Sequence, residues 1–229
     1  MATHVRSNLS IDLAVEIADA IAAALSTDPE TEGLAPPWAA LVTRGDALAG
    51  RIREQRRVAK RARARVTVAD AAWDKVLRAF ERAVIDLAGG SRDMPVYKTY
   101  FRTATGAEIT RFGIDREVEF GRATVTLLTT HIAPLSPWAD KIGPATDTLE
   151  SASRARIDAV HAMGPLLTAQ FLYVEDLNTE LDRLEGGLLT TFPGDAKRVA
   201  SYLSATRRDD PGVPDAAPVD LTPTPATGV

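Results

Sequence analysis

The sequence predicts an all-α protein: an elongated helical bundle or antiparallel coiled-coil hairpin of two long helices, at about 37–88 and 145–191. Two observations lead to this fold class. Apolar residues recur at alternating three- and four-residue steps in both ranges, which is the spacing of one helix face. No proline interrupts the first range after its opening residues, and its length far exceeds the usual helix of ~11–12 residues.

The chain is expected to start with an amphipathic helix over residues 10–26. Ser10 has the side chain of a good N-cap, and the apolar residues that follow share one face: Ile11, Ala14, Ala18, Ile21 and Leu25. Residues 26–37 contain Pro, Gly and several acids, which is typical of a linker.

The first long helix is the strongest signal in the sequence. Its predicted apolar seam has one polar member and runs through Trp38, Leu41, Gly45, Leu48, Ile52, Gln55, Ala59, Ala62, Val66, Ala69, Trp73, Val76, Phe80, Ala83 and Leu87. Pro36 and Pro37 favour a helix start, and Gly89-Gly90 favours an end. At 1.5 Å per residue such a helix is roughly 75 Å long.

The segment from 91 to 145 gives a mixed pattern and forms a subregion of shorter elements. Residues 95–101 are compatible with a short helix begun by Pro95 or with a strand, so a small β element stays open here. Residues 114–132 predict a helix that contains Gly121, although Thr and Val lower its propensity. Pro134, Pro137, Gly143 and Pro144 indicate a loop around Trp138.

The second long helix is predicted over about 145–191. Its seam contains Ile157, Val160, Gly164, Leu167, Phe171, Val174, Leu177, Leu181, Leu184 and Leu188. One additional three-residue step, between Val174 and Leu177, indicates local overwinding. Pro165 is expected to kink this helix or to split it in two.

The end of the chain changes character after a last short helix over 193–204, which has Asp195 near its start. Residues 205–229 hold five prolines, four aspartates and no aromatic residue, so they predict a disordered tail. The expected organisation is one elongated helical domain over 1–204, followed by the Pro/Asp-rich tail over 205–229.

A basic run covers residues 51–65, with eight Arg or Lys side chains and a single acid, Glu54. On the heptad of the first long helix, every basic residue falls outside the apolar seam. The run is therefore a candidate interaction surface formed by Arg51, Arg53, Arg56, Arg57, Lys60, Arg61, Arg63 and Arg65. It can be solvated or paired inside the chain, bind an acidic protein surface, or bind nucleic acid.

An acidic stretch at 175–185 is the candidate partner of this run inside the chain. Counting from the ends of an antiparallel hairpin places residues 51–65 roughly opposite 164–177, where the stretch begins. Its acids are Glu175, Asp176, Glu180, Asp182 and Glu185. Because exposed ion pairs contribute only ~0–1 kcal/mol each, this pairing would select the alignment of the helices more than it stabilises them.

The sequence gives no pattern typical of an enzyme, so we expect no catalytic residue, cofactor or metal site. Cysteine is absent, which excludes disulfides and thiolate chemistry. There is no glycine-rich phosphate loop and no nucleophile elbow. Asp158 and His161 have the spacing of a metal-binding pair on a helix, but di-metal bundles need two such pairs. His161 is therefore expected to be an ordinary flanking residue.

We expect a non-enzymatic structural, assembly or protein-interaction protein that self-associates through long amphipathic helices. The alternative is a nucleic-acid-binding protein that uses residues 51–65. A weaker alternative is a membrane-active protein that unpacks 11–25, 123–135 or 163–174 onto lipid. No secretory signal is visible and no stable membrane insertion is expected. A cytoplasmic location therefore follows as an expectation, with non-classical export left open.

Overall fold

The protein is all-α, as the sequence predicted. The computed structural model describes residues 4–102, 104–130 and 133–204, and no strand occurs within these ranges. The described part divides into two compact units. Unit 1 comprises residues up to 57 together with 162–204, and unit 2 comprises residues 58–161. Both units contain part of the same helix, and one elongated domain over 1–204 stays a prediction.

That shared helix is α2, Pro36–Leu87, which spans 52 residues without interruption. It starts at the two prolines, and Gly89 and Gly90, at φ 66° and 86°, follow its end in the left-handed region that favours glycine. The first long helix is thus confirmed at nearly its predicted bounds. The β element left open for 91–145 is absent from the described residues, where Pro95 begins a short helix instead.

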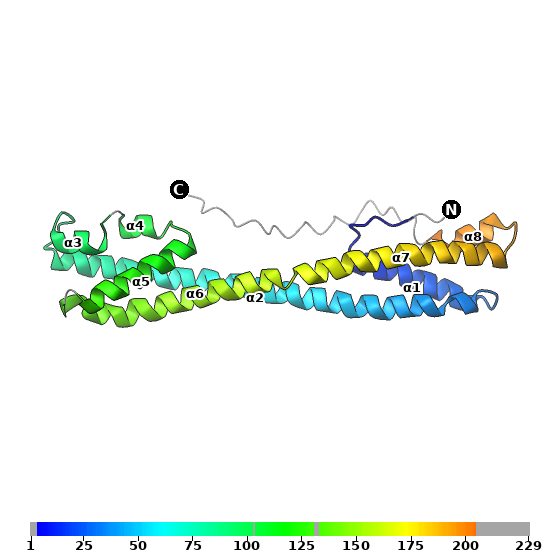
Figure 1. The fold of residues 1–229 in the computed structure, drawn as a ribbon, viewed down its shortest axis with the longest axis horizontal. Helices are drawn as coiled ribbons and strands as arrows, with labels where there is room; N and C mark the ends of the chain where they lie inside the picture. Colours follow the sequence, from blue (N-terminus) through cyan, green and yellow to red (C-terminus); the bar gives the residue numbers. More distant parts are fainter. Residues whose placement is uncertain (1–3, 103, 131–132, 205–229) are drawn as a thin grey trace. The chain divides into compact units, whose positions relative to one another are not determined.

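Unit 1 is built from α1 (Ile11–Thr27), the first part of α2 and α7 (Gly164–Thr191), with η1 (Glu32–Leu34) and α8 (Ala196–Tyr202) at one end (Figure 1). The hydroxyl of Ser10 caps α1 and the carboxylate of Asp195 caps α8, as expected. Gly187 of α7 lies beside Leu34, and Tyr173 lies beside Gly45. Residue numbers therefore fall along α7 as they rise from Leu34 toward Gly45, so α7 is antiparallel to the first part of α2.

Unit 2 contains the second part of α2, α5 (Ile114–Thr130) and α6 (Ala139–His161), with the short helices α3 (Pro95–Tyr100), α4 (Gly106–Ile109) and η2 (Ala133–Trp138) (Figure 1). The indole Nε1 of Trp73 donates to the hydroxyl of Thr146 at 3.1 Å, and the Phe80 ring lies 5.7 Å from that of Trp138. These contacts make α6 antiparallel to the second part of α2.

The second long helix differs from its prediction because residues 145–191 belong to two helices. α6 starts six residues earlier, at Ala139, and ends at His161; α7 starts at Gly164 with Pro165 in its first turn. Proline lacks an N–H and its ring blocks the preceding turn, so it is tolerated at a helix start and not inside one. The predicted split is confirmed, whereas a continuous hairpin of two long helices stays a prediction.

The predicted seams need two corrections. Near the end of α2, Leu77, Val84 and Ala88 are buried, while the predicted Val76 and Ala83 are half-buried and Leu87 is exposed. A helix of 3.6 residues per turn drifts away from a strict 3.5-residue repeat, so the buried face moves by one residue. In α6 and α7 the predicted Ile157, Leu167 and Phe171 are exposed, and Leu166 and Tyr173 are buried instead.

The predicted disordered tail, 205–229, lies outside the described residues.

Candidate functional site

The basic run of residues 51–65 lies on α2, and its side chains face solvent. Seven of the eight basic residues are exposed, and Arg56 is half-buried. Ile52 and Ala62, which are buried, belong to the core face of the helix. The prediction that the basic residues lie outside the apolar seam therefore agrees with the structure at each of these positions.

Only part of the run is paired with acids. Arg53 pairs with Asp12 of α1 at 2.6 Å, and Arg57 lies 3.5 Å from Glu54 on its own helix. Within the described part of the chain, no acid forms an ion pair with five other cations of the run: Arg51, Arg56, Lys60, Arg63 and Arg65. The charges of these five cations are therefore not neutralised by ion pairs within the described residues.

Three acids of the acidic stretch of α7 pair with residues outside the basic run. Asp176 pairs with Arg44 at 2.7 Å, and Asp182 lies 2.8 Å from the ring of His4. Glu180 pairs with Arg183, one turn along its own helix. The reason is the register in unit 1, where residues 173–176 of α7 lie against 41–45 of α2. Glu175 is exposed and Glu185 half-buried.

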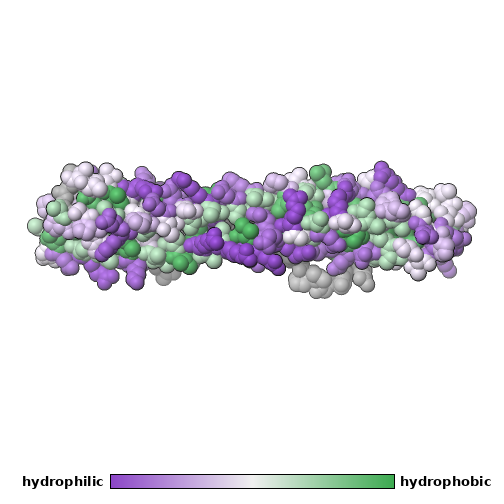
Figure 2. Space-filling view, turned by 90° about the horizontal axis from the view of Figure 1, so that it is seen from below, coloured by the Kyte–Doolittle hydropathy of each residue, from purple (hydrophilic) through white to green (hydrophobic). Residues whose placement is uncertain are grey.

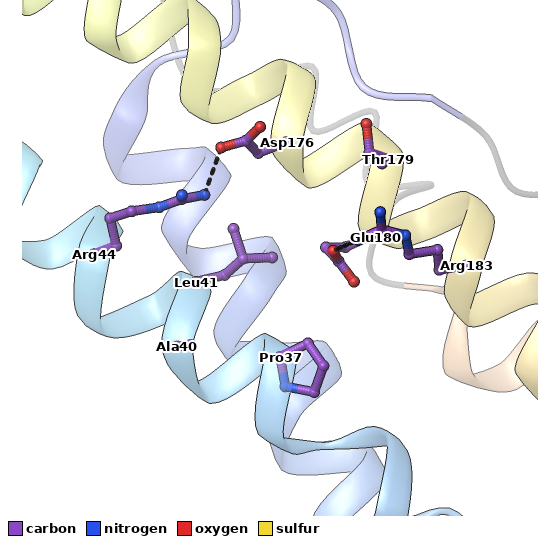
Figure 3. Close-up of a pocket in the computed structure, with 8 residues that line it drawn as sticks. All are labelled: Pro37, Ala40, Leu41, Arg44, Asp176, Thr179, Glu180 and Arg183. Atoms are coloured by element: carbon purple, nitrogen blue, oxygen red, sulfur yellow. Dashed lines mark hydrogen bonds and ion pairs between the residues drawn. The ribbon is translucent and has the colours of Figure 1, made fainter.

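A shallow groove separates α2 from α7 at this place and encloses about 430 Å³. Figure 3 shows Arg44 extending from α2 toward Asp176, while Glu180 and Arg183 project from α7. Both ion pairs of the groove satisfy their own charges, and Pro37, Ala40 and Leu41 supply the apolar wall. The groove therefore offers no uncompensated group that would attract a ligand.

A second groove, of about 340 Å³, lies in unit 2 between α5 and α6. Arg122 pairs there with Asp147 at 2.5 Å and with Glu150 at 2.7 Å, and Glu150 also pairs with Arg154. These hydrogen bonds lower the pKa of Glu150, with Arg122 as the main cause. The charges compensate one another, so this groove resembles a surface network more than a binding site.

In the described part of unit 2, the buried side-chain oxygens without a partner belong to two carboxyls, Glu117 and Asp74, and to the hydroxyl of Tyr100. Glu117 of α5 is only 4% exposed, and its Oε2 has no hydrogen-bond partner among the described residues. Burial, followed by the charge of Asp70, raises the pKa of Glu117 to about 8. Asp74, one turn from Asp70 on α2, also has a buried oxygen for which the described ranges supply no partner, and burial raises its pKa.

A second buried acid of unit 2, Glu81, is well satisfied. The hydroxyl of Tyr97 donates to its Oε1 at 2.7 Å, and Arg92 lies 3.5 Å from the same oxygen. A Cβ added at Gly106 would lie 2.4 Å from Oε2, so α4 closes over this carboxylate. Burial and the bond to Glu81 raise the pKa of Tyr97 to about 12, which keeps the phenol protonated as a donor.

Sequence reasoning missed the Glu117 group, although a signal exists. The neighbouring acid Glu119 is exposed and faces elsewhere, so these two glutamates do not form a pair. Steps of three and four residues instead join the buried positions Glu117, Gly121, Thr124 and Leu128. This buried seam can be predicted from the sequence only if polar and small residues are counted as possible members of a buried helix face.

Neither a metal site nor a membrane span is present in the part of the chain that the structure describes. In these ranges, no group of three or more His, Cys, Asp or Glu side chains could hold a metal ion. Asp158 and His161 are both exposed, as expected for ordinary surface residues. None of the described helices combines the length and the apolar character needed to cross a bilayer.

Comparison with known proteins found no relative from which a role could be transferred: no family model, no curated protein and no solved structure matches this chain.

Proposed function

We propose that this chain is a non-enzymatic helical protein that self-associates. The observation that carries the proposal is the exposure of apolar side chains at the start of α7. Leu167 is 42% exposed, Phe171 48% and Leu172 56%. Their stretch, residues 162–174, contains no charged residue. Clustered exposed apolar side chains commonly mark a protein contact.

The position of these residues strengthens the proposal. Leu167 and Phe171 continue the three- and four-residue spacing of Val174, Leu177 and Leu181, which are fully buried in unit 1. A partner helix placed on Leu167 and Phe171 would extend that packing beyond the unit. Figure 2 shows that, on the face drawn, hydrophobic residues also form separate patches between hydrophilic ones.

Sedimentation velocity over a concentration series tests the proposal. The mass of the unmodified protein should rise with concentration. The double variant Leu167→Gln and Phe171→Gln preserves charge and helix propensity, and should weaken association at least about tenfold, because each buried apolar side chain contributes ~1.5–3 kcal/mol. The control is Leu189→Gln, a singly exposed apolar residue of the same helix. An unmodified protein that stays monomeric at the highest concentration contradicts self-association.

The second candidate function is binding of nucleic acid, and one specific observation favours it. Arg51, Arg56, Lys60, Arg63 and Arg65 are not paired with acids of the described chain, so a polyanion would not have to displace an internal partner. Against it, no aromatic side chain lies between the cations to stack on bases. A sequence-independent contact with phosphates is the form of binding that this surface supports.

The matched test replaces these five cations with Gln and compares a second variant in which five scattered, exposed cations are replaced: Arg6, Lys75, Arg82, Arg116 and Lys197. Both variants change the net charge equally. If α2 binds phosphates, only the first variant should lose affinity for duplex DNA and RNA at low salt, with a shallower salt dependence. Equal losses would indicate a nonspecific charge effect, and no binding by the unmodified protein would remove this candidate.

A further inference from the structure

α5 packs into unit 2 through a seam that is mostly polar or small. Its buried residues are Glu117, Gly121, Thr124 and Leu128. A Cβ added at Gly121 would lie 2.2 Å from the hydroxyl oxygen of Thr146, so α5 and α6 approach each other closely there. One turn before this contact, the same seam places a carboxyl group, Glu117, in the interior.

Glu117 is 4% exposed, and its Oε2 has no hydrogen-bond partner among the described residues. On α2, Asp74 also has a buried oxygen without a partner in these ranges, and Asp70 is half-buried. A carboxylate that is buried without a donor or a cation is costly, so the protonated form of Glu117 is the one that fits this interior. The packing of α5 in unit 2 therefore favours a proton on Glu117.

The charges around Glu117 favour retention of this proton. The two groups that act on it, Asp70 and Asp74, are both acids of α2. Arg78, which pairs with Asp74, lies 3.5 Å from the Oδ2 of that residue and has a largely exposed side chain. α6 contacts α5 through Thr146 and through the exposed network of Arg122, Asp147 and Glu150, in which the charges are already compensated.

We propose that protonated Glu117 acts as a clasp that holds α5 in unit 2 beside Asp70 and Asp74 of α2, so that the packing of unit 2 loosens as the pH rises through the neutral and mildly alkaline range. Loss of the proton to solvent leaves a buried charge beside two carboxylates without a compensating cation. Both the desolvation of Glu117 and its repulsion by Asp70 and Asp74 then favour separation of the helices. The clasp does not depend on the self-association proposed above.

The direction of the pH dependence follows from the raised pKa of Glu117. The folded state holds a proton that the unfolded chain releases above its ordinary pKa of 4.5. The stabilising effect is complete below that value and is lost progressively as the pH rises toward about 8. One linked proton changes the folding equilibrium of unit 2 by at most about tenfold per pH unit.

The first test compares thermal unfolding of the unmodified protein and Glu117→Gln across this pH range. Gln has the shape of a protonated Glu and cannot ionise, so the variant should lose this part of the pH dependence and be more stable at alkaline pH. Glu119→Gln, two residues along the same helix and exposed, is the control and should behave like the unmodified protein. Identical pH profiles for Glu117→Gln and the control would overturn the proposal.

A second test reads the titration in the unmodified protein. Carbon-13 NMR with labelled glutamate side-chain carboxyls reports each titration directly. The proposal requires one resonance that titrates far above the others, and its assignment to Glu117 by its absence from the spectrum of Glu117→Gln. If all glutamates titrate in the ordinary carboxyl range, Glu117 does not hold the proton that the proposal requires.

Discussion

The two units bury different chemistry along the same helix. Of the described residues in unit 1, the buried ones are apolar except Thr31 and Gly45, and aliphatic side chains dominate. Unit 2 buries Glu81, Glu117, Thr124 and Thr146 together with an aromatic cluster around Phe80. The difference shows that regular heptads on α2 do not fix the character of the core, because three of these polar groups, Glu117, Thr124 and Thr146, come from α5 and α6.

Each unit has a point where helices approach closely at a glycine. In unit 1 a Cβ at Gly45 would lie 2.4 Å from Val15 and 2.6 Å from the hydroxyl of Tyr173. In unit 2 a Cβ at Gly121 would meet Thr146 at 2.2 Å, and Thr146 also accepts the hydrogen bond of Trp73. Unit 1 thus closes mainly by apolar contact, and unit 2 by a polar contact that needs matched donors and acceptors.

The largest expected effect comes from the two buried tryptophans of α2, Trp38 in unit 1 and Trp73 in unit 2. Replacing either one with Ala should cost about 3–5 kcal/mol, because it leaves a large cavity. Hydrogen exchange should show loss of protection mainly in the unit that contains the substitution. Uniform loss across both units in each variant would mean that they unfold as one body.

The close-approach glycines should give the next largest effect. Gly45→Ala and Gly121→Ala should each destabilise by about 1–3 kcal/mol, because the added methyl group has no room. Gly50→Ala is the control, since nothing lies within 4 Å of its added Cβ. That variant should gain about 0.5–1 kcal/mol from helix propensity. Denaturant unfolding measures all three, and a stabilised Gly121→Ala would refute the close approach of α5 to α6.

A smaller loss of stability is expected when only the polar contact between Trp73 and Thr146 in unit 2 is removed. Thr146→Val retains the shape of the side chain but removes the acceptor for the Trp73 indole. The expected cost is about 1–3 kcal/mol, because a buried donor is left without a partner. Trp73→Phe combined with Thr146→Val should recover part of this loss. Denaturant unfolding of Thr146→Val, Trp73→Phe and the double variant tests this. If the loss of the double variant equals the sum of the two single losses, the two side chains are not coupled.

The smallest expected effect is a loss of stability at acid pH, which should come mainly from unit 1. Tyr202, which donates to Asp28 at 2.6 Å, and then Arg198 lower the pKa of Asp28 to about 2. A depressed carboxyl pKa contributes stability that is present above about 3.8 and is lost as the pH falls toward 2. Tyr202→Phe should reduce this acid dependence in pH-dependent thermal unfolding, while Tyr100→Phe in unit 2 should leave it unchanged.

The same difference between the units explains what could be predicted from the sequence. Trp38, Leu41 and Leu48 of α2 and Leu177 to Leu188 of α7 are apolar and regularly spaced, so their burial in unit 1 was readable. Ser10 and Pro165 indicated helix boundaries correctly, because caps and prolines act locally. The last helix begins at Ala196, after Asp195, three residues later than predicted.

The remaining features of the fold and of the candidate sites could not be predicted from the sequence, because they depend on tertiary contacts. Glu117 is buried because α2 and α5 meet there, and no local rule places a glutamate in a core. The register that pairs Arg44 with Asp176 also places Gly187 of α7 beside Leu34, before α2 begins, so the ends of the two helices are not level as the count assumed. Leu167 and Phe171 have the spacing of core residues but face solvent, because α7 begins anew at Gly164 and buries Leu166 and Tyr173 in this part instead.

The most direct test of the difference between the units is hydrogen exchange of the unmodified protein from about pH 6 to about pH 9, corrected for the intrinsic pH dependence of exchange. Protection of α5 should fall as the pH rises, while that of α7 should stay constant. Equal changes in both helices, or constant protection of α5, would contradict a pH-sensitive polar core that is specific to unit 2.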